Sequence, residues 1–232
     1  MRITYYGHAC FFVEIGNKKL LFDPCISHNP LTKVAKVDIS KINPDYILLS
    51  HGHEDHLSDA FEIAIQSDAK VIAVYEVQQW FEKQGIPGHG MNTGGKWKFD
   101  FGTVKLVNAV HSSMLPDGSY GGNPVGFVVT NDHEGTFYFA GDTALTLDMK
   151  LIPMICPKLD FAILPIGDNF TMGYDDAVIA SNFINCNTII GCHYDTFPPV
   201  KLDHSTAKKT FSRAGKNLFL PEIAMTFNIK KK

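Results

Sequence analysis

The sequence predicts an α/β fold in which two β-sheets pack face to face and helices cover their outer sides. Two observations lead to this prediction. Each half of the 232-residue chain starts with a strand-rich stretch and continues with alternating strand and helix patterns. No low-complexity linker and no clear internal repeat divides the chain. We therefore expect one domain over residues 1–232, a length that is ordinary for a layered α/β domain.

The first half predicts five strands and two helices. The pair Gly16-Asn17 marks a hairpin turn between the second and third strands. Ser58-Asp59 can cap the first helix, which carries the apolar residues of 61–65, and Gly85 follows the second helix. The predicted strands cover residues 3–6, 10–15, 19–22, 46–49 and 71–74, and the second helix covers residues 75–84.

The second half predicts eight strands and two further helices. Asp175 and Asp176 stand in the first turn of a helix over 175–183, where the helix dipole favours negative charge. Gly215 directly follows a helix over 205–214 and is a good C-terminal cap. The predicted strands cover residues 97–99, 103–107, 125–130, 136–140, 161–164, 188–190, 218–220 and 224–229.

The composition is that of a soluble globular protein. Hydrophobic residues make up 45% and charged residues 19%, and the formal net charge is −3. The only basic run is formed by the last three lysines, so broad nucleic-acid binding is not expected. No apolar stretch approaches the ~20 residues that span a bilayer, so we expect no membrane partner. The oligomeric state stays open, with a homo-oligomer among the alternatives.

The cysteine pattern and the first residues favour the cytoplasm. Five cysteines are odd in number, widely spaced and without a Cys-x-x-Cys pair, so a disulfide framework is not expected. The N-terminal residues lack the charged and then apolar pattern of a secretory signal. We therefore expect a reducing, cytoplasmic location.

The most informative segment is His51-Gly52-His53-Glu54-Asp55-His56, directly after the predicted strand over 46–49. Imidazole nitrogen and carboxylate oxygen form the ligand set that suits zinc and its neighbours. His51 and His53 are two residues apart and share a face, so they can bind one ion together. Asp55 and His56 stand at an expected helix start and point elsewhere, which favours two metal positions. Glu54 is expected to face solvent.

Three further residues follow apolar strands: His111, Asp142 and His193. The carboxyl ends of strands converge on one edge of a layered sheet, so these side chains can meet although they are far apart in sequence. Each residue alone is a weak signal, because a lone histidine at a strand end is more often a hydrogen-bonded surface group. His8 also follows a strand. It can contact substrate or support a metal ligand, or it can bond to backbone near the surface.

The expected substrate pocket involves two loops. Thr171 and Met172 lie in a glycine-rich loop between a strand and a helix, and they either form a pocket wall or order the loop by packing. Tyr194 directly follows His193 and opens a stiff, proline-containing loop near the site. Cys192 has the wrong strand parity to share the face of His193, so it is not expected to be a ligand.

The ordered set of these residues resembles the metallo-β-lactamase superfamily of binuclear hydrolases. The segments 7–10, 140–143 and 167–173 are similar to a largely uncharacterised bacterial branch of metal-dependent hydrolases related to L-ascorbate-6-phosphate lactonase. The resemblance implies a four-layer αββα sandwich of two mixed sheets flanked by helices. It also implies two divalent ions, with zinc expected and manganese or nickel as alternatives. The implied ligands of one ion are His51, His53 and His111; those of the other are Asp55, His56 and His193; Asp142 bridges both.

The resemblance implies a binuclear hydrolase in which a metal-bridging hydroxide attacks a small-molecule ester, lactone or phosphoester. Asp55 and Asp142 are the expected catalytic carboxylates, and His8 is a further catalytic candidate. The phosphate part of this expectation comes from the relative alone. One alternative is a redox enzyme with one or two iron ions, although its relatives tend to carry a carboxylate in place of His53. The other is a non-catalytic binding module, which would be expected to lose ligands.

Overall fold

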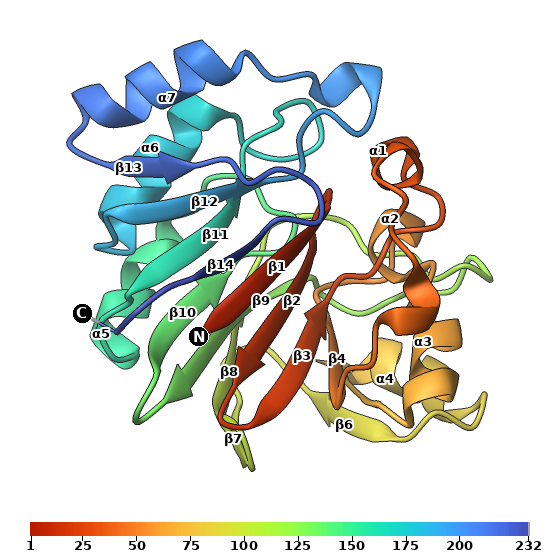
Figure 1. Ribbon diagram of the computed structural model, residues 1–232. Helices are drawn as coiled ribbons and strands as arrows, with labels where there is room; N and C mark the ends of the chain where they lie inside the picture. The colour runs from red at the N-terminus through yellow and green to blue at the C-terminus, as the bar shows by residue number, and fades with distance from the viewer. Residues whose placement is uncertain (232) are drawn as a thin grey trace.

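The computed structural model describes residues 1–231 and places fourteen strands in two seven-stranded sheets (Figure 1). The first sheet contains β1 (Arg2–Gly7), β2 (Cys10–Ile15), β3 (Lys18–Phe22), β4 (Tyr46–Leu49), β5 (Lys70–Val74), β6 (Gly88–Met91) and β14 (Thr226–Asn228). The second contains β7 (Lys96–Phe99), β8 (Gly102–Asn108), β9 (Val125–Asn131), β10 (Gly135–Phe139), β11 (Phe161–Pro165), β12 (Thr188–Cys192) and β13 (Asn217–Phe219). Their spatial orders are β14-β1-β2-β3-β4-β5-β6 and β13-β12-β11-β10-β9-β8-β7.

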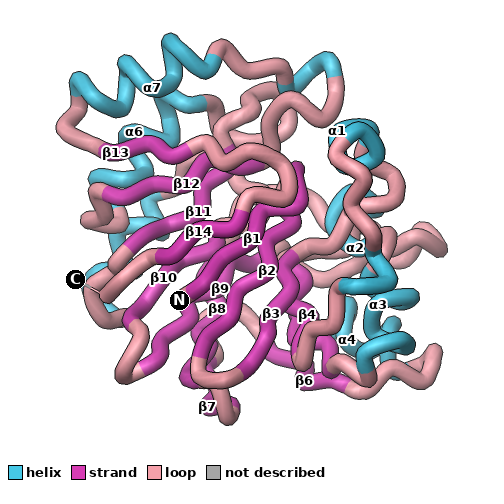
Figure 2. The backbone as a smooth tube through the Cα atoms, viewed as in Figure 1, coloured by secondary structure: helices cyan, strands magenta, loops and turns pink. Residues whose placement is uncertain are grey.

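Helices lie outside the two sheets, as the tube view shows (Figure 2). They are α1 (Pro30–Val34), α2 (Glu54–Leu57), α3 (Ala60–Ser67), α4 (Tyr75–Glu82), α5 (Ile152–Ile155), α6 (Tyr174–Phe183) and α7 (His204–Arg213). Short 3-10 turns are η1 (Ile39–Lys41), η2 (Leu147–Leu151) and η3 (Pro198–Val200). Among residues 1–231, no helix has both the length and the apolar character needed to cross a bilayer.

Alternating side chains along the strands divide the core into three apolar layers. In β3, Phe22 packs into the central cluster between the sheets, whereas its neighbour Leu21 packs outward against the layer that contains α3 and α4. The Phe22 ring centroid lies 5.8 Å from that of Phe137 and 4.9 Å from that of Phe139, which join the two sheets. The third layer lies between the second sheet and α6 and α7. These layers confirm the predicted fold class.

The predicted hairpin between β2 and β3 is confirmed in detail. Gly16 and Asn17 both have positive φ, 58° and 61°, as a two-residue turn with the twist of the strands requires. The predicted cap of α3 is wrong in its chemistry, because the Asp59 carboxylate accepts hydrogen bonds from the backbone N–H groups of Ile26 and Ser27 instead. Asp59 therefore fixes the loop after β3.

Strand β6 was not predicted, because its sequence Gly-His-Gly-Met contains no apolar run. It pairs in parallel with β5, and a Cβ built on Gly88 would come within 2.1 Å of the Val71 carbonyl oxygen. Only glycine allows that approach. The closing strand is also shorter than the predicted 224–229: only Thr226–Asn228 pairs with β1, next to a backbone hydrogen bond from Ile229 N to Met1 O.

Strand direction determines where side chains can converge. In the first sheet β1, β3 and β4 run the same way, and in the second sheet β8, β10 and β12 do so. Their carboxyl ends meet at one edge of the sandwich, which is the edge where the predicted ligand residues follow.

Candidate metal centre

Six strand ends, three from each sheet, supply the side chains of the centre. The loop after β4 carries His51 and His53 and continues into α2, whose first turn carries Asp55 and His56. The residues contributed by the other strand ends are His8 after β1, Asp23 after β3, His111 after β8, Asp142 after β10 and His193 after β12. The fold therefore brings together positions that are up to 185 residues apart in sequence, from His8 to His193.

Three of these residues have a left-handed backbone. The φ angles of His8, Asp23 and His193 are 54°, 40° and 57°. Such angles are uncommon for residues other than glycine and cost roughly 1 kcal/mol or more each, and they concentrate at functional sites. Each turns the chain sharply at the end of a strand and directs a polar side chain to the sheet edge.

One group of imidazoles consists of His51, His53 and His111, whose candidate ligand atoms lie within 4.8 Å of one another. Nε2 of His51 lies 3.0 Å from Nδ1 of His53. The His111 ring centroid lies 5.1 Å from that of each of the other two rings. Three neutral nitrogen donors at these separations suit one zinc-type ion.

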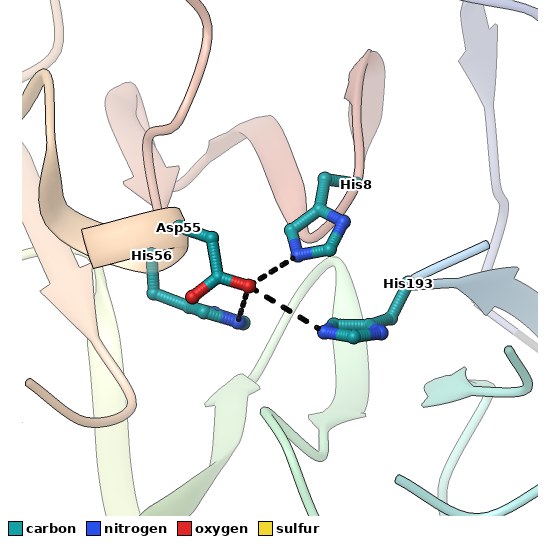
Figure 3. A group of neighbouring side chains, drawn as sticks. All are labelled: His8, Asp55, His56 and His193. Carbon is teal, nitrogen blue, oxygen red and sulfur yellow. Dashed lines mark hydrogen bonds and ion pairs between the residues drawn. The ribbon is translucent and has the colours of Figure 1, made fainter. Parts of the chain in front are cut away.

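A second group consists of His8, Asp55, His56 and His193, again within 4.8 Å (Figure 3). Oδ2 of Asp55 faces all three rings. It lies 3.0 Å from Nε2 of His8 and 3.8 Å from Nε2 of both His56 and His193. The sequence predicts Asp55, His56 and His193 as neighbours; the structure adds His8 to them.

Asp142 lies between the two groups. Its Oδ2 is 3.6 Å from Nε2 of His111 in the first group and 3.0 Å from Nε2 of His193 in the second. Its Oδ1 is 3.3 Å from Nε2 of His56. A carboxylate in this position can reach an ion in either group.

Burial and the carboxylates set the charge of the centre. Burial lowers the pKa values of His51, His53 and His111, which favours the neutral form that binds metals. Burial by itself raises the pKa of Asp142, but His56 and His193 outweigh it and hold that pKa well below its usual range. The His51, His53 and His111 rings are therefore neutral and lie beside an ionised Asp142 carboxylate.

Several buried polar atoms point to a bound cation. Nε2 of His56, Oδ1 of Asp142 and both ring nitrogens of His193 are buried and make no hydrogen bond within residues 1–231. Buried polar atoms are nearly always hydrogen-bonded, and each exception requires an explanation. Three of these four atoms face the centre. Nε2 of His56 lies 3.3 Å from Oδ1 of Asp142, and Nε2 of His193 lies 3.0 Å from Oδ2 of Asp142. The donor set and its unsatisfied atoms fit divalent metal ions.

His8 is buried deep in the site. Its exposed fraction is 0%, Nε2 lies 3.0 Å from Oδ2 of Asp55, and Nδ1 lies 3.0 Å from Oγ1 of Thr196. Burial, with help from His193, lowers the pKa of His8 to about 4. His8 is therefore a neutral ring that holds Asp55, rather than a histidine bonded to backbone near the surface.

Two supporting residues escaped the sequence analysis. Asp23 and Ser50 are both buried beneath the centre and are hydrogen-bonded to each other. Asp23 also accepts from His56, and Ser50 bonds to His51. The signal that could have found Asp23 is the one used for Asp142, because it too is a carboxylate that directly follows an apolar strand.

A cavity of 480 Å³ opens above the centre. Besides four residues of the two groups and Asp142, its lining includes Ser112, Phe170, Phe197 and Pro199. The two loops expected to form the substrate pocket both reach this cavity, but through Phe170, Phe197 and Pro199 and not through Thr171, Met172 or Tyr194. Thr171 is half-buried and Met172 is buried in the outer apolar layer. Tyr194 is buried, stacks on Tyr5 and donates to the carbonyl of Pro221.

Comparisons with known proteins agree with this geometry. A profile described as the Beta-lactamase superfamily domain matches residues 2–193. A UPF0173 metal-dependent hydrolase of Christiangramia forsetii is 52% identical over 229 residues, which cover 99% of this chain and 100% of the relative. A protein of the same description from Flavobacterium johnsoniae is 50% identical, with the same coverage of both chains.

A solved structure shares the whole fold. A metallo hydrolase from the hyperthermophilic archaeon Ignicoccus hospitalis superimposes with a TM-score of 0.86 and 32% sequence identity, over 99% of both chains. This likeness confirms the arrangement of two mixed seven-stranded sheets with flanking helices.

Proposed function

The chain belongs to the UPF0173 metal-dependent hydrolases of the metallo-β-lactamase superfamily, and we propose that it is a binuclear enzyme that hydrolyses an ester, lactone or phosphoester bond of a small molecule. The observation that carries this proposal is the position of Asp142 between two groups of ligand-type side chains. One ion in each group, with Asp142 between them, would give partners to Nε2 of His56, Nε2 of His193 and Oδ1 of Asp142, which are buried without hydrogen bonds.

Bound divalent ions would supply Lewis acidity and a water that ionises near neutral pH. The side chains of this protein then have distinct tasks. His51, His53 and His111 would hold one ion, and Asp55, His56 and His193 the other. Asp142 would keep the two positions at a fixed separation, and the cavity would admit the substrate.

His8 would act through Asp55. With a proton on Nε2, it donates to Oδ2 of Asp55, while Nδ1 accepts from the Thr196 hydroxyl. This pair of bonds fixes the Asp55 carboxylate with one oxygen toward His8, whose own ring is fully buried. His8 is thus proposed as a positioning residue for a metal ligand.

Zinc is the proposed native metal, with manganese and nickel as alternatives. An imidazole at position 53 in place of a carboxylate makes the first group entirely nitrogen-based, which suits zinc better than an oxygen-reducing di-iron site. We also propose a cytoplasmic location and a small-molecule substrate, without a nucleic-acid or membrane partner. Among residues 1–231, no disulfide joins any of the five cysteines, Cys10, Cys25, Cys156, Cys186 and Cys192, which suits a reducing compartment.

The first experiment is elemental mass spectrometry of protein purified without chelators or a histidine tag. We expect about two zinc, manganese or nickel ions per chain, as the two ligand groups require. The loaded protein is then assayed for acid release from lactones, esters and phosphoesters, with the Asp142→Ala variant as the control for contaminating hydrolases.

Three results would count against the proposal. Iron with dioxygen consumption would favour the redox alternative. A protein that neither contains nor takes up metal on titration would favour a non-catalytic binding module. Equal hydrolysis by the loaded protein and by Asp142→Ala would show that the activity comes from elsewhere.

A further inference from the structure

The cavity above the metal centre has two unlike sides. Its floor consists of the ligand-type side chains, and its outer wall is formed by Phe170, Phe197 and Pro199. A substrate whose scissile bond lies at the floor must place the rest of its structure against this outer wall. The inference below rests on the proposed hydrolytic function, because that function fixes which end of the substrate faces the floor.

Phe170 is held in place although it is exposed. It lies in the loop between β11 and α6, where Asp168 and Asn169 have left-handed φ angles of 62° and 56°. A bridge between Gly167 and Gly173 closes this loop, and a hydrogen bond from Met172 N to Thr143 O ties it to the segment that carries Asp142. The Phe170 side chain is 53% exposed, which leaves much of an aromatic ring uncovered at the mouth of the cavity.

Phe197 is fixed by the loop that follows β12, residues 194–202. Asp195 accepts a hydrogen bond from Leu202 N at 2.9 Å, and its own N–H donates to Val200 O at 2.8 Å. Pro198 and Pro199 stiffen the loop further. The Phe197 ring packs edge-on against His8, with centroids 5.5 Å apart. The backbone that carries both rings is therefore fixed, and the Phe197 ring is also packed in place.

Among residues 1–231, the outer lining of the cavity offers no lysine or arginine to an anionic group. The three loops that supply its outer lining, residues 109–124, 167–173 and 194–200, contain Asp117, Asp168 and Asp195 and no basic residue other than His111. A phosphate or carboxylate placed against this wall would lose water without gaining a cationic partner.

We propose that the substrate carries an uncharged apolar group, aromatic or alkyl, next to its scissile bond, and that Phe170 and Phe197 select for it. Anionic substituents away from the reacting centre are disfavoured. This differs from the phosphorylated substrate that the lactonase resemblance implies, because within the described part of the chain the cavity offers such a substrate no lysine or arginine beside the metals.

The test measures binding as well as turnover. Three hydroxamates share a metal-chelating head group but differ in the attached group: acetohydroxamate, phenylacetohydroxamate and succinic monohydroxamate, which bears a carboxylate. Their affinities for the zinc-loaded protein are measured by isothermal titration calorimetry. We expect phenylacetohydroxamate to bind at least about tenfold tighter than acetohydroxamate, since it buries a ring against two others. Succinic monohydroxamate is expected to bind no tighter than acetohydroxamate.

Phe170→Ala and Phe197→Ala should each remove most of the advantage of the phenyl group. Phe61→Ala is the matched control, because Phe61 lies on α3, away from the cavity, and is 36% exposed. Tightest binding of the carboxylate-bearing compound, an unchanged phenyl advantage in both cavity variants, or no binding of any hydroxamate would each overturn the inference.

Failure of the proposed function gives a different result. If the hydroxamates rank as expected but no ester, lactone or phosphoester is hydrolysed, the hydrolytic proposal fails and the selectivity of the cavity stands. If lactones are hydrolysed but a carboxylate-bearing lactone is preferred over its phenyl analogue, the function stands and the inference on substrate class is wrong.

Discussion

Nδ1 of His56 lies 2.7 Å from Oδ2 of Asp23, and both side chains are fully buried. The same oxygen accepts from the Ser50 hydroxyl at 2.6 Å, and Ser50 Oγ in turn lies 2.9 Å from Nδ1 of His51. One carboxylate thus orients an imidazole of each ligand group, His56 directly and His51 through Ser50. Because both Nδ1 atoms are engaged, the two Nε2 atoms are free to bind metal.

Asp23→Asn should weaken metal binding at both positions. The amide replaces one acceptor oxygen by an NH2 group. At least one of the N–H or O–H donors that now bond to Asp23 would then face another donor. We expect metal affinity to fall about 10- to 100-fold, as is usual when such a supporting partner is lost. Competition with a chromogenic chelator measures this loss without any activity assay.

Two variants sharpen the Asp23 prediction. Ser50→Ala should lower the affinity for the ion of the His51 group more than the affinity for the other ion. Among the imidazoles, Ser50 contacts only His51. Asp38→Asn is the matched control, because Asp38 is a partly exposed carboxylate that caps η1, in the segment between β3 and β4. Unchanged affinity in Asp23→Asn, or an equal loss in Asp38→Asn, would contradict the role given to Asp23.

Substitutions of the ligands should separate the two ions. His111→Ala removes a donor from the first group only, so about one ion per chain should remain. Asp142→Ala removes the carboxylate that both groups contact and should lower the number of metal ions per chain towards zero. Elemental analysis after dialysis against metal-free buffer measures both numbers, and identical contents in the two variants would argue against two separate positions.

Removal of metal should lower thermal stability. The buried carboxylates of Asp23 and Asp142 and the unsatisfied atoms of His56 and His193 are costly without a cation between them. With free zinc at about a hundred times its Kd, we expect Tm to rise by roughly 5 to 10 °C over the chelated protein. Differential scanning fluorimetry with and without chelator measures the shift, and an unchanged Tm would speak against a folded-state metal site.

His8→Ala should keep the metals and lose most turnover. Asp55 would lose the partner that fixes its carboxylate, whereas the other side chains of the two groups would stay in place. His8→Gln offers a donor of similar reach and should retain more activity than His8→Ala. The experiment pairs metal content with kcat; loss of one ion in His8→Ala would contradict the expectation that the metals stay, and full activity would leave His8 without a role.

Phe137→Ala should destabilise the layer between the sheets. Phe137 is fully buried, with its ring centroid 5.8 Å from Phe22 and 5.0 Å from Phe161. Truncation leaves a cavity and should cost about 3–5 kcal/mol in the free energy of unfolding. Phe61→Ala, at the helix surface, should cost less than about 1 kcal/mol. Urea unfolding in the presence of chelator compares the two variants without a contribution from metal, and equal costs would contradict the packing described here.

The sequence predicts most strands and the residues of both ligand groups because these signals are local. An apolar run followed by His or Asp is visible at His51, His111, Asp142 and His193 without any knowledge of their neighbours. The structure adds what depends on packing between distant segments. Strand β6 exists only because β5 offers it a partner, and His8 joins the second group only because Asp55 faces it.

The outer wall of the cavity shows the same limit of prediction from the sequence. Tyr194 was predicted at the pocket because it follows His193, but the turn at His193 directs its ring toward Tyr5. Phe197, three residues further on, reaches the cavity instead. Adjacency in sequence places a loop near the site, whereas the side chain that points inward depends on the backbone angles of the turn.

The pairing of β14 with β1 has a consequence for synthesis on the ribosome. β1 ends at Gly7, and its pairing partner β14 begins only at Thr226. At about 5–20 residues per second, the nascent chain therefore carries an unpaired edge on β1 for roughly 10 to 45 s. Until β14 is synthesised, this edge is open to strand addition by other chains, so products truncated before Thr226 should aggregate more readily than chains that contain β14.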